Sequence, residues 1–421
     1  MMKISVAGSG YVGLVTAIGW ADKGHDVTCI DIDENKVSLI NSKKSPFYEK
    51  GVNEKLEALD IAASSSFDSV KDSDMVFIAV GTPSLPSGEI DLSYIKSCSA
   101  SIADNLPTAK FPIIILRSTV IPGTTEDVMI PILEKNGLKA KLDFGVAMMP
   151  EFLREGTALS DFSSPDRLVM GPSDEKTRKI LEGLVRDFDC PKLFTNIKTA
   201  ELIKYASNAM LATRVSFTND FARICHECGA DIDHVMKGTG LDSRIGERYL
   251  VAGPGFGGAC LPKDVSALAQ FSDSKLMKAV LEVNDSQIDY IIAMMEKELG
   301  SLSNKTIAIL GLAFKAGTDD VRTSQSIPMI HALIAKGANV RGCDPKAVGN
   351  AKKLLDMEYC TLEETAGCDA ALLLTAWPEF MKDAKFYKKL LKDAPFFDMR
   401  RILDQKDAIK EKLNYHAFGR G

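Results

Sequence analysis

The sequence has no apolar run of the roughly 20 residues that a membrane-spanning helix needs, and no excess of basic residues. Its 51 Lys and Arg residues face 57 Asp and Glu residues, which gives a formal net charge of -6. Nucleic-acid binding needs a concentrated basic surface. We therefore expect neither a membrane protein nor a nucleic-acid-binding protein.

We expect no signal peptide at the start of the sequence, and its cysteines follow no regular pattern. It passes from Met1 directly into a short apolar strand. Its nine cysteines are an odd number at irregular spacing, which is typical of free thiols in a reducing compartment. Cys225 and Cys228 resemble half of a zinc site, but no second pair has zinc-ligand spacing. We expect a cytoplasmic protein without a bound metal.

What the sequence does contain begins with a dinucleotide-binding pattern. A strand at residues 3–7 leads into Gly8, Gly10 and Gly13, a helical stretch follows at 14–23, and a second strand at 26–30 ends at Asp31. The glycines allow a tight turn and close approach of a pyrophosphate, and the acid suits the ribose hydroxyls. This context predicts NAD binding, because a carboxylate would repel the 2′-phosphate of NADP.

Three later strands are predicted at residues 74–80, 113–117 and 143–148, and each ends in a distinctive loop. The loops begin at Gly81, Ser118 and Pro150, and the third contains two carboxylates and an arginine within residues 150–156. Ligands of doubly wound sheets bind at the carboxyl ends of the strands. We therefore expect the first two loops to line the cofactor and the third to be a polar site rather than a solvated loop.

The middle of the chain is helical, with helices predicted at residues 199–236 and 275–299. Glu201, Lys204, Tyr205 and Asn208 fall on one helical face, which is either a functional face or a solvated Glu–Lys stripe. Residues 253–264 form a glycine-rich loop that contains Cys260. It is either a flexible turn or a nucleophilic site, because a thiolate is a strong nucleophile.

From residue 305 the strand and helix alternation returns, with strands at 306–310 and 339–342, a helix at 327–336, and later strand ends at 370–375 and 396–401. This second unit lacks the GxGxxG spacing and favours a nucleotide-like ligand other than a second dinucleotide. The predicted fold is α/β, two Rossmann-like doubly wound domains joined by a helical central region. The predicted domains are 1–198 for NAD binding, 199–300 for dimerisation and the catalytic loop, and 301–421 for the second ligand.

The motifs at residues 8–13, 150–156, 255–264 and 314–322 occur in an order that resembles the UDP-glucose/GDP-mannose dehydrogenase family over essentially the whole chain. The resemblance implies an NAD-dependent four-electron oxidation of a nucleotide sugar, with UDP-glucose giving UDP-glucuronate for polysaccharide biosynthesis. It implies that Cys260 forms a thiohemiacetal and then a thioester. The implied catalytic residues are Cys260, Lys204, Asp264, Asn208, Glu151 and Thr119.

The resemblance also implies two sets of binding residues and a homodimer or higher homo-oligomer in which Arg244 reaches the partner's site. The implied NAD contacts are Gly8, Gly10, Tyr11, Val12, Gly13, Asp31, Lys36, Gly81, Thr82, Thr119, Glu155 and Arg322. The implied UDP-sugar contacts are Glu151, Phe152, Leu153, Arg154, Glu155, Lys204, Asn208, Arg244, Tyr249, Gly255, Phe256, Gly257, Lys315 and Arg401.

Three alternatives stay open. Residues 244–246 and Lys263 favour UDP-glucose, with GDP-mannose or another nucleotide sugar as the rival substrate. A β-hydroxyacid dehydrogenase would share the layout but would need no cysteine. A regulator that binds NAD without reducing it would need only the dinucleotide-binding pattern that ends at Asp31.

Overall fold

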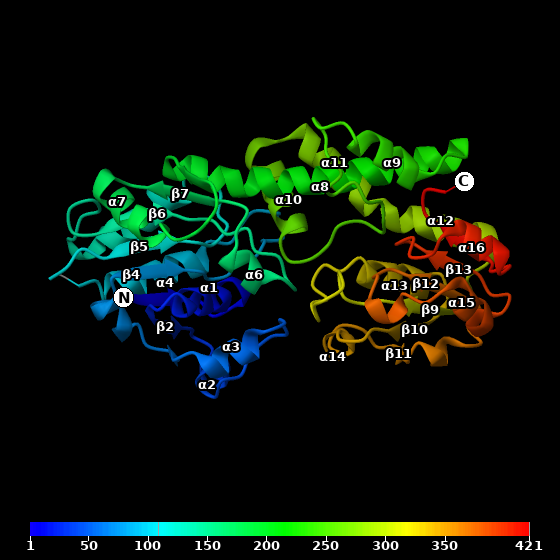
Figure 1. The fold of residues 1–421 in the computed structure, drawn as a ribbon, viewed down its shortest axis with the longest axis horizontal. Helices are drawn as coiled ribbons and strands as arrows, with labels where there is room; N and C mark the ends of the chain where they lie inside the picture. Colours follow the sequence, from blue (N-terminus) through cyan, green and yellow to red (C-terminus); the bar gives the residue numbers. More distant parts are fainter. Residues whose placement is uncertain (108, 421) are drawn as a thin grey trace. The chain divides into compact units, whose positions relative to one another are not determined.

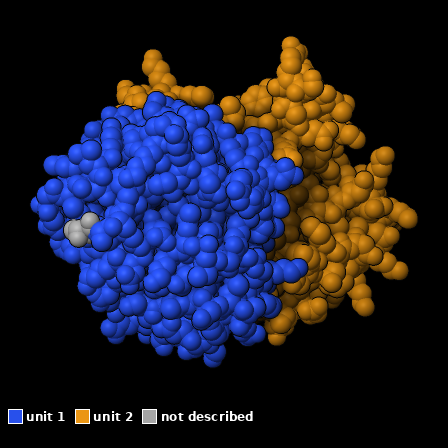
Figure 2. Space-filling view, turned by 60° about the vertical axis from the view of Figure 1, so that its left-hand side comes forward, with its two compact units in different colours: residues 1–207 blue, residues 208–421 orange. Residues whose placement is uncertain are grey.

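The computed structural model describes residues 1–107 and 109–420, and its contacts divide the chain into two compact units, residues 1–207 and 208–421 (Figure 2). The long helix α8 (Ile197–Cys228) contributes residues to both units. The predicted division into three domains is finer than these two units and stays a prediction.

The first unit contains an eight-stranded sheet in the order β3-β2-β1-β4-β5-β6-β7-β8. The six strands from β3 to β6 are parallel, whereas β7 runs antiparallel to β6 and pairs in parallel with β8. The strands are β1 (Lys3–Ala7), β2 (Asp26–Ile30), β3 (Ile61–Ser64), β4 (Met75–Ile78), β5 (Ile113–Leu116), β6 (Gly145–Met148), β7 (Leu168–Pro172) and β8 (Lys192–Phe194).

Helices cover both faces of this sheet, and α1 contacts β1 and β2; Figure 1 shows α1 beside β2. One apolar cluster joins α1, α3, α6 and α7 to one face, and a second joins α4, α5 and the start of α8 to the other. The helices are α1 (Tyr11–Asp22), α2 (Glu34–Asn41), α3 (Val52–Ala58), α4 (Ser93–Ala103), α5 (Ile130–Leu133), α6 (Ala158–Ser163) and α7 (Glu175–Leu184), with a π-helical turn (Thr124–Met129) before α5.

The buried strands explain why the sequence revealed the sheet. All four residues of β5, Ile-Ile-Ile-Leu, are 0% exposed, as expected for a central parallel strand covered on both faces. The strands predicted at 74–80, 113–117 and 143–148 are present with shorter ends. The reversal at β7 was not predicted, because its apolar run carries no signal of strand direction.

The second unit contains six parallel strands in the order β11-β10-β9-β12-β13-β14, which repeats the order β3-β2-β1-β4-β5-β6 of the first. The prediction of two Rossmann-like sheets with a helical region between them in sequence is confirmed. The strands are β9 (Thr306–Leu310), β10 (Asn339–Cys343), β11 (Glu358–Tyr359), β12 (Ala370–Leu373), β13 (Phe396–Asp398) and β14 (Tyr415–Ala417).

The helices of this unit fall into a helical segment before the sheet and the helices packed on the sheet (Figure 1). They are α9 (Ile232–Gly240), α10 (Leu261–Ser272), α11 (Lys275–Asp285), α12 (Gln287–Leu299), α13 (Ser326–Ala335), α14 (Val348–Ala351), α15 (Ala384–Leu391) and α16 (Gln405–Lys410).

Both predicted central helices are interrupted. The helix predicted at 199–236 ends near Gly229, whose φ of 75° lies in the left-handed region, and α9 restarts after Asp231, whose side chain caps the new helix. The helix predicted at 275–299 breaks at Ser286, which follows Asn284 and Asp285, residues of low helix propensity. Both corrections follow from local sequence.

Within residues 1–107 and 109–420, the helices are too short or too polar for any of them to cross a membrane.

Candidate active site

The turn after β1 has the geometry of a dinucleotide-binding turn. Gly8 has a φ of 93°, and a Cβ on Gly13 would lie 1.7 Å from the carbonyl oxygen of Gly8, so chain packing alone requires both glycines. A Cβ on Gly10 would have no atom within 4 Å, so no contact of this chain requires that glycine. Gly10 stands at the N-terminus of α1, where backbone N–H groups favour an anion. The residues therefore fit the pyrophosphate of NAD.

Asp31, at the end of β2, holds the same turn. Its Oδ2 accepts hydrogen bonds from the backbone and hydroxyl of Ser9, both at 2.7 Å, and lies 3.5 Å from Lys36 Nζ. Burial acts to raise the pKa of Asp31, but hydrogen bonds from Asp33 and Ser9 outweigh it and hold the pKa below its usual range. The carboxylate is therefore ionised, and its contact with the ribose hydroxyls stays a prediction.

The loops after the neighbouring strands β4 and β5 are joined to one another by hydrogen bonds, and their contact with the cofactor stays a prediction. Thr82 Oγ1 donates to the carbonyl oxygen of Thr119 at 2.9 Å, and Ser118 Oγ donates to the carbonyl oxygen of Val80 at 2.7 Å. A Cβ on Gly81 would meet no atom within 4 Å, so a ligand can approach this backbone closely.

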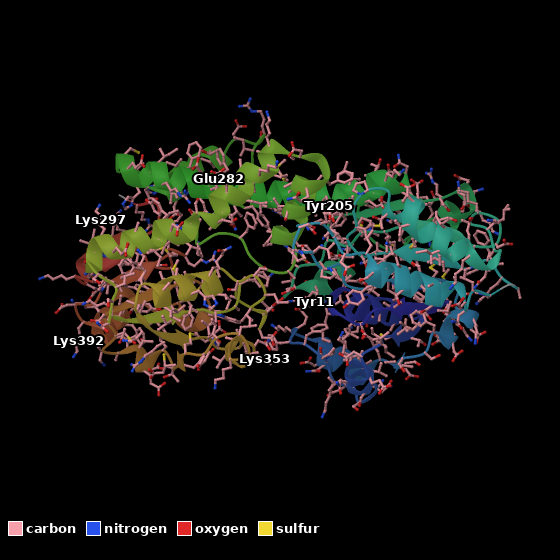
Figure 3. All side chains as sticks on the ribbon, turned by 180° about the vertical axis from the view of Figure 1, so that it is seen from behind. Tyr11, Tyr205, Glu282, Lys297, Lys353 and Lys392 are labelled. Atoms are coloured by element: carbon pink, nitrogen blue, oxygen red, sulfur yellow. The ribbon has the colours of Figure 1, made fainter. Side chains whose placement is uncertain are left out.

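Glu49 connects the dinucleotide-binding turn at residues 8–13, the fingerprint turn, to the 150–156 loop. This role of Glu49 was not predicted from the sequence. Its carboxylate accepts from Tyr11 Oη and Gly156 N, both at 2.6 Å, and from Ala158 N at 3.0 Å. Figure 3 labels Tyr11, the first residue of α1. Burial, then Glu49, and also the charge of Glu155, raise the pKa of the Tyr11 hydroxyl. A lone glutamate in a loop gives no pattern that would reveal this role.

Glu151 and Lys204 form a buried ion pair, with Glu151 Oε1 2.8 Å from Lys204 Nζ and side-chain exposures of 6% and 5%. Glu151 Oε2 also accepts from Leu153 N at 2.6 Å. Burial acts to raise the pKa of Glu151, but Lys204, the Leu153 amide and the charge of Arg117 together lower it. Burial lowers the pKa of Arg117 to about 10. Glu151 is thus a buried carboxylate between two cations.

Two neighbours in the 150–156 loop are fixed by the first unit itself. Arg154 pairs with Asp161, with 2.5 Å between Nη2 and Oδ1, and the Phe152 ring lies 3.9 Å from the Arg167 guanidinium. A cavity of about 60 Å³ lies beside this loop, and its lining includes Glu151, Phe152 and Arg154. The predicted substrate contacts of Phe152, Leu153 and Arg154 stay predictions.

The polar face of α8 is buried, so the alternative of a solvated stripe is wrong. Glu201 and Tyr205 are 0% exposed, Lys204 is 4% exposed and Asn208 is 7% exposed. Glu201 holds the turn before the π-helical segment by accepting from Gly123 N, Thr125 N and Thr125 Oγ1 at 2.6 to 2.8 Å. The face is therefore a polar interior surface, and Figure 3 labels Tyr205 on it.

In the second unit, Cys260 stands at the N-cap position of α10 and is exposed. Asp264, one turn later and 1% exposed, accepts from Asn208 Nδ2 at 2.6 Å and lies 2.7 Å from Lys263 Nζ. The structure thus brings Asn208, Asp264 and Lys263 together one turn beyond the exposed thiol. The catalytic roles implied for Cys260, Asn208 and Asp264 stay predictions.

The glycines of the loop before Cys260 pack against their own unit. A Cβ on Gly257 would lie 2.4 Å from the Thr323 carbonyl oxygen, and one on Gly258 would lie 2.7 Å from the Phe314 ring. Gly255 has a φ of 112°. The Phe256 side chain is 4% exposed in an apolar cluster with residues of α8, α10 and α11, so it is a core residue. Contacts of Gly255, Phe256 and Gly257 with a substrate stay predictions.

The remaining predicted site residues all belong to the second unit, and each has its own local contacts. Arg244 is exposed and pairs with Asp242, Tyr249 has a left-handed φ of 64°, and Arg322 pairs with Asp320. Lys315 Nζ lies 5.4 Å from the Phe314 ring centroid. The Arg401 side chain is 3% exposed, and its Nε donates to Asp233 Oδ1 at 2.9 Å. Within the described residues, Arg401 Nη1 has no hydrogen-bond partner, so a donor remains there for a ligand.

The Cys225 to Cys228 segment forms the C-terminal end of α8, where Cys225 is buried and Cys228 is exposed. In the part of the chain that the structure describes, no group of three or more His, Cys, Asp or Glu side chains is arranged to hold a metal ion.

Comparison with known protein families gives matches in three segments of the chain. Three models of the UDP-glucose/GDP-mannose dehydrogenase family match: the NAD binding domain at residues 2–189, the central domain at 198–286 and the UDP binding domain at 308–405.

Two curated relatives and one solved structure are similar over at least 94% of their lengths. UDP-glucose 6-dehydrogenase TuaD of Bacillus subtilis is 39% identical over 100% of this chain and 94% of its own. UDP-glucose 6-dehydrogenase of Rhizobium meliloti is 40% identical over 100% of both chains. The UDP-glucose dehydrogenase structure from Pyrobaculum islandicum has a TM-score of 0.92 and 35% identity, covering 100% of this chain and 98% of that one.

These matches confirm the resemblance inferred from the four motifs and the prediction of NAD as cofactor. The chain therefore belongs to the UDP-glucose/GDP-mannose dehydrogenase family, as an NAD-dependent dehydrogenase with a UDP-binding domain.

Proposed function

We propose that this enzyme oxidises C6 of UDP-glucose to the carboxylate of UDP-glucuronate, with water supplying the second carboxylate oxygen. The observation that carries the proposal is the exposed Cys260 thiol at the N-terminus of α10, one turn before the buried Asp264 and Asn208 pair. Relatives that share the whole chain are named as UDP-glucose 6-dehydrogenases. NAD, when bound at the turn that contains Gly8, Gly10 and Gly13, would supply the hydride acceptor for each of the two oxidations at C6.

In the first half of the reaction, the C6 hydroxyl transfers its proton through water to a carboxylate, a role that we assign to Asp264, and C6 loses a hydride, which leaves an aldehyde. Lys204 and Asn208, four residues apart on α8, are the groups we assign to the oxygen of C6. An ammonium and a carboxamide both donate hydrogen bonds, and both stabilise negative charge that develops on an alkoxide.

In the second half, the Cys260 sulfur adds to the aldehyde carbon, and the oxygen takes a proton. The resulting thiohemiacetal retains the aldehyde and is a better hydride donor, and its oxidation gives a thioester. The N-terminus of α10 favours negative charge on the attacking sulfur.

Water then adds to the thioester carbon, and the Cys260 sulfur leaves and is protonated. We assign the orientation of this water to Glu151 and Thr119. Glu151 is ionised between Lys204 and Arg117 and lines the 60 Å³ cavity, which has room for water. Asp264, held by Asn208 and Lys263, is the second carboxylate available to accept protons.

We also propose a cytoplasmic homodimer that supplies polysaccharide biosynthesis and in which Arg244 reaches the partner's substrate site. Two observations support a dimer. Met210, Phe217 and Ile224 recur every seven residues on α8 and are 62%, 45% and 48% exposed. The Arg244 side chain is 87% exposed in the single chain.

The role of Cys260 is tested by Cys260→Ala, with Cys228→Ala as the matched control because Cys228 is also an exposed thiol. With UDP-glucose and NAD, Cys260→Ala is expected to lose steady-state turnover by about 1,000-fold or more, because the thioester no longer forms. Cys228→Ala is expected to keep wild-type turnover. Full turnover by Cys260→Ala would reject the thioester route and favour the β-hydroxyacid dehydrogenase alternative.

A further inference from the structure

The glycine-rich loop before Cys260 is held by side-chain carboxamides from outside the loop. Gly253 N donates to Asn219 Oδ1 of α8 at 2.8 Å, and the Gly253 carbonyl accepts from Gln287 Nε2 of α12 at 2.8 Å. Asn219 and Gln287 are each 0% exposed. Both backbone groups of Gly253 are therefore bound by buried carboxamides.

The other end of the same turn is held in the same way. Asn284 Oδ1, at the end of α11, accepts from Phe256 N at 2.7 Å, and its Nδ2 donates to the Phe256 carbonyl at 3.3 Å. Gln325 Nε2 also donates to that carbonyl, at 2.7 Å. A carboxamide suits this place because it carries a donor and an acceptor without charge.

These contacts constrain the residue between the two ends. Gly255 has a φ of 112°, and a Cβ there would lie 2.8 Å from Asn284 Oδ1. Arg223 Nε in turn donates to Gln287 Oε1 at 2.9 Å, which fixes the orientation of the Gln287 carboxamide. Residues 253–256 are therefore held by a connected set of hydrogen bonds, which apolar packing alone would not supply.

We propose that Asn284 and Gln287 are positioning residues that set the conformation of residues 253–256 and thereby the place of the Cys260 thiol, four residues further along. Each acts through the loop backbone, because Asn284 contacts Phe256 and Gln287 contacts Gly253. The break between α11 and α12 at Ser286 places the two carboxamides on either side of it.

The test compares Asn284→Ala with Asn414→Ala, a matched asparagine of the same unit that pairs with Glu298 away from the loop. Asn284→Ala leaves Phe256 N unpaired, which we expect to raise KM for UDP-glucose about ten- to a hundredfold. KM for NAD is expected to stay within about twofold of wild type, because the fingerprint turn is untouched. Asn414→Ala is expected to keep both constants.

Two measurements do not depend on turnover. Hydrogen exchange of a peptide that covers residues 250–260 is expected to be slow in the wild type and faster in Asn284→Ala. The rate at which iodoacetamide alkylates Cys260 is expected to change at least about threefold in Asn284→Ala and to stay unchanged in Asn414→Ala.

The kinetic arm rests on the proposed oxidation of UDP-glucose. If the wild type fails to turn over UDP-glucose, the proposed function is wrong, whereas the exchange and alkylation measurements still decide the role of Asn284.

Unchanged exchange and unchanged Cys260 alkylation in Asn284→Ala would overturn the positioning role. If Asn284→Ala does not fold, Asn284→Asp takes its place in the same measurements, because it keeps the acceptor for Phe256 N. Rapid hydrogen exchange of the 250–260 peptide in the wild type would also overturn the positioning role.

Discussion

Glu151 illustrates at the scale of a residue how the interior of the first unit sets its chemistry. Its carboxylate is buried, yet Lys204, the Leu153 amide and Arg117 keep its pKa below the ordinary value of 4.5. Burial of a charge is costly unless the charge is paired. The ion pair therefore keeps a charged group inside the unit, beside a cavity that admits water.

This arrangement predicts a pH dependence of stability. Because the folded pKa of Glu151 is lowered, its stabilising contribution is present above about pH 4.5 and is lost as the pH falls through the folded pKa, by about 1.4 kcal/mol for each unit of lowering. Urea unfolding between about pH 6 and about pH 3 is expected to show a larger loss for the wild type than for Glu151→Gln.

The exposed Glu54 provides the control for this measurement, since Glu54→Gln removes a carboxylate from the surface of α3. It is expected to follow the wild type. Equal losses of unfolding free energy in the wild type and Glu151→Gln would mean that the Glu151 and Lys204 pair does not hold the carboxylate charged.

The role of a site residue could be predicted from the sequence only where the residue belongs to a recognisable motif. Asp31 follows a strand at a fixed distance from three glycines, and Cys260 ends a run of glycines, so both stood out. Glu49 and Gln287 did not, because their roles come from hydrogen bonds to backbone groups far away in sequence. Spacing carries no information about such partners.

At the scale of elements, α8 contributes polar side chains to both units. Its buried face carries Glu201 and Lys204 in the first unit and Asn208 in the second, while Met210 and Phe217 are exposed. A helix of this length presents different faces to different surroundings, so its periodicity correctly grouped the polar residues. Their burial was not predictable, because a Glu and Lys stripe is more often solvated.

The glycines of the fingerprint and of the Cys260 loop look alike in sequence but serve different ends. Gly10 has open space where a Cβ would stand, whereas Gly257 faces the Thr323 backbone at 2.4 Å. The first is therefore left open for a ligand, and the second is required by packing within its own unit. Only the structure shows which glycine leaves room for a ligand and which is required by packing.

At the scale of the whole molecule, the proposed dimer gives Arg244 a role that one chain does not supply. The prediction is complementation between two inactive variants, Arg244→Ala and Cys260→Ala. In a mixed dimer, one site has an intact Cys260 and receives an intact Arg244 from the partner. Equal mixtures are expected to recover about a quarter of wild-type activity, since half of the dimers are mixed and half of their sites are intact.

The complementation requires that subunits exchange, which is achieved by co-expression of two differently tagged chains. Light scattering of the purified wild type is expected to give twice the mass of the chain. A mixture as inactive as its components, in a sample shown to contain mixed dimers, would mean that Arg244 serves its own subunit.

The central claim is the four-electron oxidation of UDP-glucose, and the most direct measurement is the number of NADH molecules formed per sugar consumed. Limiting UDP-glucose is converted with excess NAD in ¹⁸O-labelled water, and parallel samples contain GDP-mannose and other UDP-sugars. The account predicts two NADH per UDP-glucose and one ¹⁸O atom in the new carboxylate. One NADH with a free aldehyde or ketone, or binding of NAD without any NADH, would contradict it, and two NADH from GDP-mannose alone would reassign the substrate.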